Sequence, residues 1–171
     1  MKAEEIKTIV VIGAGAMGQQ IAMNTVMNGR KHSYQVILCD SFEGAIGKAE
    51  KWASDYLSGR VAKGRLTQEE ADKIADCLTI TKDVDTAVSE ADFIIEAIIE
   101  NLEIKRELFR KISRICRPDA VLGTNSSNIV SSRLADVTVN PERLLNIHYF
   151  NPALVMQLVE LVKGGHTSEE T

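Results

Sequence analysis

A stretch near the N-terminus decides the fold: residues 8–22 read TIVVIGAGAMGQQIA. Its apolar beginning predicts a buried strand at Ile9–Ile12. A helical pattern follows almost at once and predicts a helix over Met17–Asn28. Three glycines lie at the junction of the two elements, so this turn is either a plain structural link or a binding site.

The three glycines have the spacing G-x-G-x-x-G, which alone is weak evidence for a nucleotide site. A second predicted strand, Val36–Cys39, follows and ends in Asp40, which completes the arrangement of a dinucleotide-binding unit. Gly13 allows the tight turn, Gly15 lets a pyrophosphate approach the backbone, and Gly18 lets the helix pack closely on the strand. The pyrophosphate would lie at the positive N-terminus of the helix. We therefore predict a dinucleotide site, with a purely structural turn as the alternative.

Asp40 predicts which dinucleotide is bound. Its carboxylate would accept hydrogen bonds from a ribose 2′-hydroxyl and repel a 2′-phosphate, which favours NAD over NADP. Asp40 lies 27 residues after Gly13, which is longer than the usual spacing of about 20. The excess is a polar loop at residues 28–35, where Arg30 and Lys31 are the cations that would weaken the preference for NAD.

The composition is that of an ordinary globular protein. Of 171 residues, 44% are hydrophobic and 26% are charged, and the net charge of −4 argues against nucleic acid as a general partner. The charged start and the short apolar run after it predict neither a signal peptide nor a membrane span. Cys39, Cys77 and Cys116 are far apart and lack the spacing of a metal site, so we expect reduced thiols, no metal and a cytoplasmic location.

Strand-like runs alternate with helical patterns, which predicts an α/β fold with a Rossmann-type, doubly wound, mostly parallel sheet. The predicted strands are Ile9–Ile12, Val36–Cys39, Phe93–Ile98, Ala120–Leu122, Leu144–Tyr149 and Val155–Val162. The predicted helices are Met17–Asn28, Gly44–Lys63, Thr67–Cys77, Leu102–Cys116 and Ser131–Val137. Two charged helices stand in tandem after the second strand, and Thr67 and Glu70 have the spacing of a capping box. We interpret the helical pair as an excursion from the sheet, suited to holding a substrate tail.

The second informative stretch is Asn146–Val162, in which two strand-like runs flank a turn at Asn151-Pro152. His148 lies near the end of the first run and Glu160 lies on the second, so adjacent strands would bring them together. A carboxylate on one ring nitrogen fixes the histidine tautomer, and the other nitrogen can then take a proton from an alcohol. Oxidation of a secondary alcohol by NAD needs such a base. The alternative is a salt bridge at a sheet edge, and the pattern alone does not decide.

Four motifs carry a resemblance to a known family. They are GAGAMG at residues 13–18, EAIIENLEIK at 96–105, TNSS at 124–127 and HYFNP at 148–152. Over nearly the whole chain this resembles the N-terminal domain of the L-3-hydroxyacyl-CoA dehydrogenases, including the 3-hydroxybutyryl-CoA dehydrogenases. The resemblance implies NAD-dependent, reversible oxidation of a (3S)-3-hydroxyacyl-CoA, with a short acyl chain such as 3-hydroxybutyryl-CoA, to the 3-oxoacyl-CoA.

The resemblance also implies roles for single residues. His148 matches the catalytic base, Glu160 its carboxylate partner, and Asn151 an asparagine that acts in catalysis and substrate binding. Ser127 matches a serine that binds the substrate oxygen, and it is preferred to Ser126 because the spacing to His148 then needs no gap. The implied cofactor-binding residues are Gly13, Gly15, Ala16, Met17, Gly18, Asp40, Ala97, Glu100, Lys105 and Asn125.

Some of these residues have ordinary explanations when the family is set aside. Glu100 and Lys105 would then be a solvated charge pair. The helical pair carries the cations Lys51, Arg60, Lys63 and Arg65. The resemblance makes them candidates for the coenzyme A phosphates, with Lys63 as the substrate-binding residue, whereas a solvated charged face is the alternative. Trp52 and Tyr56 are four residues apart, which favours packing over an adenine platform.

Members of the family continue into a C-terminal helical domain that forms their dimer interface and covers the cleft. We expect residues 1–171 to be the NAD-binding domain alone, truncated before that second domain, and therefore to bind NAD but turn over acyl-CoA poorly. The competing class is a non-catalytic NAD-binding module, which would need neither His148 nor Glu160. A related dehydrogenase with a lysine base fits less well.

Overall fold

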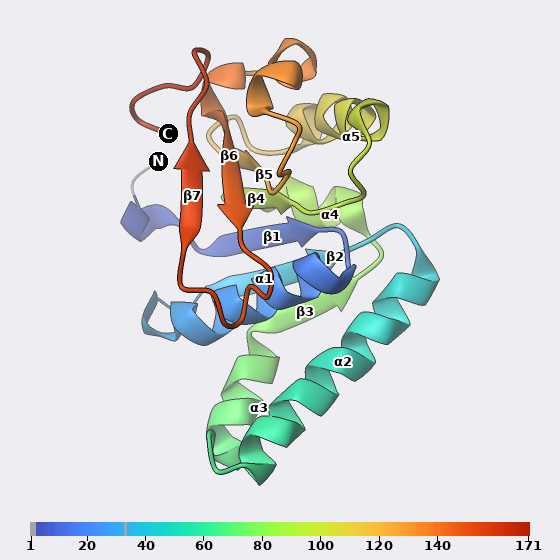
Figure 1. Ribbon diagram of the computed structural model, residues 1–171, viewed down its shortest axis with the longest axis vertical. Coiled ribbons are helices and arrows are strands. Elements are labelled where there is room, and N and C mark those ends of the chain that lie inside the picture. The colour runs from blue at the N-terminus through green and yellow to red at the C-terminus, as the bar shows by residue number, and fades with distance from the viewer. Residues whose placement is uncertain (1–2, 33) are drawn as a thin grey trace.

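The computed structural model describes residues 3–32 and 34–171 and contains one seven-stranded sheet in the order β3-β2-β1-β4-β5-β6-β7 (Figure 1). The strands are β1 (Thr8–Ile12), β2 (Gln35–Cys39), β3 (Leu78–Thr81), β4 (Phe93–Glu96), β5 (Val121–Thr124), β6 (Leu144–Tyr149) and β7 (Val159–Val162). Strands β1 to β6 are parallel, and β7 runs antiparallel to β6. The predicted Rossmann-type, mostly parallel fold is confirmed.

Helices cover both faces of this sheet. The α-helices are α1 (Ala16–Asn28), α2 (Glu43–Ala62), α3 (Gln68–Asp76), α4 (Val84–Ser89) and α5 (Leu102–Ile115). Short 3-10 turns are η1 (Ala3–Glu5), η2 (Gly29–His32), η3 (Ser131–Arg133), η4 (Ala135–Val137) and η5 (Pro141–Arg143). Alternate residues of β1 feed two hydrophobic clusters: Ile9 and Val11 pack with α1, α2 and α3, whereas Val10 and Ile12 pack with α4 and α5. This two-sided burial explains why β1 is apolar throughout.

Helices α2 and α3 form the helical pair predicted from the sequence. They connect two neighbouring parallel strands, β2 and β3, and extend away from the sheet beyond β3 (Figure 1). The predicted capping box is present, because the Thr67 hydroxyl accepts from the Glu70 N–H at 3.1 Å and the Glu70 carboxylate accepts from the Thr67 N–H at 2.9 Å. The Trp52 and Tyr56 rings stack with centroids 5.4 Å apart and pack against the core. The packing interpretation of these two rings is confirmed.

Four sequence-based expectations about elements were incomplete or wrong. Strand β3 and helix α4 were missed, because β3 is half polar and α4 has only six residues. The expected helix at Ser131–Val137 is instead the two 3-10 turns η3 and η4, since seven residues without a long apolar face do not propagate an α-helix. The expected strand Val155–Val162 is extended only in β7, because the N–H groups of Val155 and Met156 both donate to the carbonyl of Pro152 in a turn.

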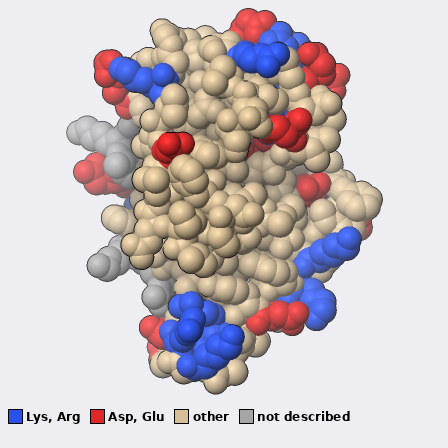
Figure 2. All heavy atoms as spheres, viewed as in Figure 1, with Lys and Arg blue, Asp and Glu red and all other residues tan. Residues whose placement is uncertain are grey.

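The remaining features of the described residues concern membrane spans, metal clusters, cysteines and the charged surface. Among the described residues, no helix is long and apolar enough to cross a membrane, and no cluster of acids, histidines and cysteines is arranged to hold a metal. The three cysteines are unpaired, and burial, helped by Asp40 and Asp83, raises the pKa of Cys39 to about 12. Basic side chains gather at the far tip of the helical pair, where Lys63 and Arg65 are exposed (Figure 2).

Candidate active site

A cleft of about 970 Å³ opens at the carboxyl ends of β1, β4 and β5. The strand order reverses direction between β1 and β4, which is where open α/β sheets bind their ligands. Nine of the ten implied cofactor-binding residues line this cleft: Gly13, Gly15, Ala16, Met17, Asp40, Ala97, Glu100, Lys105 and Asn125. The tenth, Gly18, lies beneath it in the first turn of α1.

The glycine turn is shaped to hold a phosphate. Gly13 has φ +107°, and a Cβ there would lie 2.6 Å from the Ala97 carbonyl oxygen, so only glycine fits. A Cβ on Gly18 would lie 1.7 Å from the Gly13 oxygen, which keeps α1 tight against the turn. A Cβ on Gly15 would meet no atom within 4 Å, so Gly15 faces open space in the cleft. Gly15 is also the N-cap of α1 and supplies no side-chain acceptor, which leaves the first amides of the helix free for an anion.

Asp40 is held firmly at the edge of the cleft. One carboxylate oxygen accepts the Ala14 N–H and the other accepts the Phe42 N–H, both at 2.9 Å. Each oxygen keeps a further lone pair that can accept from a ribose hydroxyl. The side chains of Arg30 and Lys31, which would weaken a preference for NAD, lie outside what the structure describes. The geometry therefore fits a dinucleotide with a free 2′-hydroxyl.

A buried ion pair forms the floor of the cleft. Lys105 is 1% exposed, and its Nζ lies 2.5 Å from Oε1 of Glu96, which is 0% exposed. The other Glu96 oxygen accepts from the Thr124 hydroxyl at 2.7 Å, and Oε1 also accepts the Ile98 N–H. An unpaired charge would be costly here, so each partner holds the other in place. The alternative of a solvated pair is wrong for Lys105.

Glu100 connects the cofactor cleft to the loop after β5. Its carboxylate lies 3.5 Å from Lys105 Nζ and accepts hydrogen bonds from the Ser126 hydroxyl and, at 3.1 Å, from the Asn128 N–H. Burial acts to raise the pKa of Glu100, but the hydrogen bonds from Ser126 and Asn128, together with the Lys105 ammonium, outweigh it. The pKa of Glu100 therefore lies below its usual value, and the group stays ionised in mildly acidic solution.

His148 and Glu160 lie directly opposite each other on the antiparallel strands β6 and β7. His148 Nδ1 is 2.9 Å from a Glu160 oxygen, and His148 Nε2 is 2.9 Å from Ser127 Oγ. Because a carboxylate only accepts, Glu160 fixes the proton of the neutral ring on Nδ1. The bare Nε2 then accepts from the Ser127 hydroxyl, and Ser127 itself lines the cleft. The contact expected from the turn at Asn151-Pro152 is present, and it reaches the cofactor cleft through Ser127.

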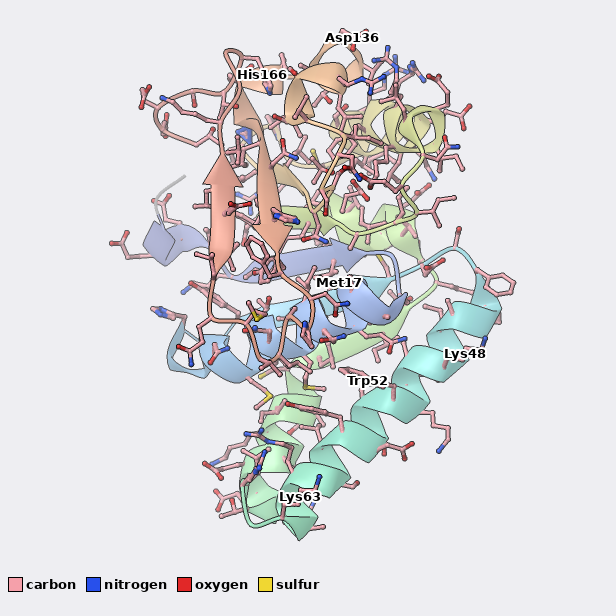
Figure 3. The ribbon with its side chains drawn as sticks, viewed as in Figure 1. Met17, Lys48, Trp52, Lys63, Asp136 and His166 are labelled. Carbon is pink, nitrogen blue, oxygen red and sulfur yellow. The ribbon has the colours of Figure 1, made fainter. Side chains whose placement is uncertain are left out.

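Two of the implied site residues, Asn151 and Lys63, do not take part in the hydrogen bonds that join Ser127, His148 and Glu160. Asn151 is exposed, and its side chain makes no hydrogen bond to any residue that the structure describes. Lys63 lies at the C-terminal end of α2, at the far tip of the helical pair, whereas Met17 lies in the middle of the molecule (Figure 3). Among the described residues, neither Asn151 nor Lys63 makes a hydrogen bond or ion pair with Ser127, His148 or Glu160, so the roles of both stay predictions.

The comparisons with known proteins agree with this geometry. Residues 8–171 match the family model described as the NAD-binding domain of 3-hydroxyacyl-CoA dehydrogenase. The chain belongs to this family. Its cofactor is NAD, as the four sequence motifs predict.

The relatives of this NAD-binding domain are longer proteins. The chain is 38% identical to the 3-hydroxyadipyl-CoA dehydrogenase of Escherichia coli, covering 96% of this chain and 34% of that protein. It is 36% identical to a probable 3-hydroxybutyryl-CoA dehydrogenase of Bacillus subtilis, covering 98% and 56% respectively. A crystal structure of 3-hydroxybutyryl-CoA dehydrogenase from E. coli superposes with a TM-score of 0.90 at 38% identity, covering 97% of this chain and 34% of that one. The chain thus spans about a third to a half of the length of these relatives.

The sequence reasoning missed three polar residues of this NAD-binding domain. Glu96 and Thr124 pair within the sheet beneath the cleft, and Asn146 lies on β6 two residues before His148. Each was visible as a polar residue at the end of, or within, an apolar strand. Such a residue is costly to bury unless it has a partner, so it marks a polar network. Their partners lie on other elements, Lys105 on α5 and Thr124 on β5 for Glu96 and the loop after β5 for Asn146, so the pairing cannot be read from the strand itself.

Proposed function

We propose that this chain is the NAD-binding and base-carrying part of a 3-hydroxyacyl-CoA dehydrogenase, which oxidises a (3S)-3-hydroxyacyl-CoA to the 3-oxoacyl-CoA and reverses that reaction. The observation that carries the proposal is the Ser127–His148–Glu160 chain of hydrogen bonds at the rim of the NAD cleft. Bound NAD supplies the acceptor for the hydride. Everything else in the step depends on how the protein places the substrate hydroxyl and takes its proton.

The proton goes to His148. A substrate hydroxyl that reaches both Ser127 Oγ and His148 Nε2 would accept from the serine and donate to the ring. Nε2 would then take the proton from the oxygen as hydride leaves the carbon that bears it. Glu160 keeps the Nδ1 proton in place and stabilises the imidazolium that forms. Ser127 then holds the oxygen as it becomes a carbonyl. In the reverse direction His148 returns the proton to that oxygen.

The cofactor contacts follow the cleft. The amides at the start of α1, beside the open space at Gly15, suit the pyrophosphate, and Asp40 suits the adenosine ribose. Glu100, Lys105, Ala97 and Asn125 line the part of the cleft next to Ser127, which suits the nicotinamide half. This assignment puts the nicotinamide next to the base, as hydride transfer requires.

A short acyl group and a second domain complete the proposal. Relatives named for 3-hydroxybutyryl-CoA and 3-hydroxyadipyl-CoA support a short acyl chain. The segment leading into and along β7 exposes a run of large apolar side chains: Val155, Met156, Leu158, Val159, Leu161 and Val162. An apolar surface of this kind supports a partner domain that covers it and dimerises, as the greater length of the relatives also suggests. Turnover by residues 1–171 alone should be slow, because the apolar surface beside the proposed base faces solvent.

The test is turnover of acetoacetyl-CoA with NADH by the chain and by a chimera that carries the remaining part of the E. coli relative. His148→Ala should lower kcat by about 10²- to 10⁴-fold, because the general base is lost. His166→Ala is the matched control, since His166 bonds the Leu144 carbonyl at the other end of β6 and touches neither Ser127 nor Glu160. Near-normal turnover by His148→Ala would exclude His148 as the base and favour a non-catalytic NAD-binding module.

A further inference from the structure

Asn146 is a buried polar residue that the proposed mechanism does not use. It is 6% exposed and lies on β6 with only Ile147 between it and His148. Successive side chains of a strand point to opposite faces, so Asn146 and His148 leave the sheet on the same face. The strand that carries the base therefore also carries an amide beside it.

The Asn146 amide grips the loop that carries Ser127. We call residues 125–131 the serine loop. The Asn146 Nδ2 group donates to the carbonyl oxygens of Ser126 and Ile129, each at 3.3 Å, and Oδ1 accepts the Ser131 N–H at 2.7 Å. Both amide hydrogens are used, and the contacts lie on both sides of Ser127 along the chain.

The opposite side of the serine loop is held by the cofactor cleft. Glu100 accepts from the Ser126 hydroxyl and from the Asn128 N–H. The loop is thus fixed between a residue of the NAD cleft and a residue of the base-carrying strand. Ser127 lies between these two attachments, and among the described residues its exposed side chain makes one hydrogen bond, to His148 Nε2.

We propose that Asn146 is a positioning residue, which sets the place of Ser127 relative to His148 by holding the serine loop to the same strand face. It touches neither cofactor nor substrate and acts through Ser127. The effect of Asn146 on the reaction rests on the proposed function. Its effect on the Ser127–His148 hydrogen bond does not. A merely structural asparagine would support the loop without affecting the Ser127–His148 hydrogen bond.

The coupling is measured by NMR on this 171-residue chain, using the ¹⁵N resonance of His148 Nε2. Spectra of His32→Ala and His166→Ala assign that resonance. Ser127→Ala should shift it, because the ring loses its hydrogen-bond donor. Asn146→Leu should shift it in the same direction, and the Ser127→Ala/Asn146→Leu double variant should give the value of Ser127→Ala alone. Asn146→Ser, which keeps one hydroxyl donor in a smaller side chain, gives the same comparison if the leucine variant does not fold.

Ser113→Ala is the matched control. Ser113 is also 6% exposed and holds another loop by accepting the Val139 N–H at 3.0 Å, away from the serine loop. It should lower the unfolding temperature without moving the His148 resonance. If both Asn146 variants leave that resonance at its wild-type value, or if the double variant gives the sum of two independent shifts, the proposal is overturned.

Turnover separates this proposal from the proposed function. In the acetoacetyl-CoA assay, Asn146→Leu should lower kcat by about a hundredfold, as expected for a misplacement of about 1 Å. The Ser127→Ala/Asn146→Leu double variant should have the same kcat as Ser127→Ala alone. If the chain and the chimera show no turnover while the NMR coupling is present, the proposed function fails and the positioning role stands. If His148→Ala abolishes turnover while the Asn146 variants change neither turnover nor resonance, the positioning role fails and the function stands.

Discussion

The cofactor cleft and the base-carrying edge of the sheet are built differently. The cleft rests on the parallel centre, where Glu96 and Lys105 are 0% and 1% exposed and pair with each other. The proposed base, His148, lies at the antiparallel edge, where Glu160 is half exposed and the apolar residues of β7, such as Leu161 at 68%, face solvent. The chain therefore combines a cleft with a buried, paired floor and a proposed His148–Glu160 pair beside exposed apolar side chains. Binding of NAD and proton transfer should be separable in this chain by substitution.

The largest effect that tests this comparison should come from the glycine turn. Gly18→Ala would place a Cβ 1.7 Å from the Gly13 oxygen, and this overpacking should destabilise the domain by about 3 kcal/mol and abolish NAD binding. Gly15→Ala is the matched change, because its Cβ meets no atom of the protein. It should leave the unfolding midpoint unchanged and still weaken NAD binding, since it occupies the phosphate space. Equal unfolding midpoints for the two variants in urea would contradict the described turn.

A smaller effect is expected at the ribose end of the cleft. Asp40→Ala removes a charged hydrogen-bond acceptor and should weaken NAD binding by roughly tenfold to a hundredfold, while NADP binding is unchanged or improved. Asp76→Ala, an exposed acid of α3 outside the cleft, is the control. The measurement is the ratio of the dissociation constants for the two cofactors. A wild-type preference for NADP would show that Arg30 or Lys31 overrides the carboxylate.

The smallest effect concerns Glu100, which joins the two regions. Its folded-state pKa is lowered, so its contribution to stability is present above the pKa of the unfolded carboxyl and is lost as the pH falls through the folded pKa. Urea midpoints of wild type and Glu100→Gln should differ at neutral pH and converge in strong acid. The side chain is partly exposed, which keeps the difference small. Glu107→Gln, the same change at an exposed residue of the same cleft, is the control. A pH-independent difference between wild type and Glu100→Gln would contradict the hydrogen-bonded carboxylate.

Much of the cofactor cleft could be predicted from the sequence because its determinants are local. The glycine turn, the strand before it and the acid after the next strand lie in one continuous segment, and parallel pairing leaves little choice of arrangement. His148 and Glu160 could also be paired from the sequence, since their strands are consecutive in the chain and are separated only by residues 150–158. Strand β3 and helix α4 escaped because short, partly polar segments acquire their structure from neighbours. The bonds of Glu96 to Lys105 and of Asn146 to the serine loop depend on contacts between elements, which no periodicity encodes.

Calorimetric titration of NAD into the wild-type chain and into His148→Ala tests the central claim most directly. Because the cleft is complete without the β6–β7 edge, the two proteins should bind NAD with equal dissociation constants. NAD at a hundred times that constant should then stabilise both by about 2.7 kcal/mol, while only the wild type retains turnover. Loss of NAD binding in His148→Ala, or no binding by the wild-type chain, would contradict the account.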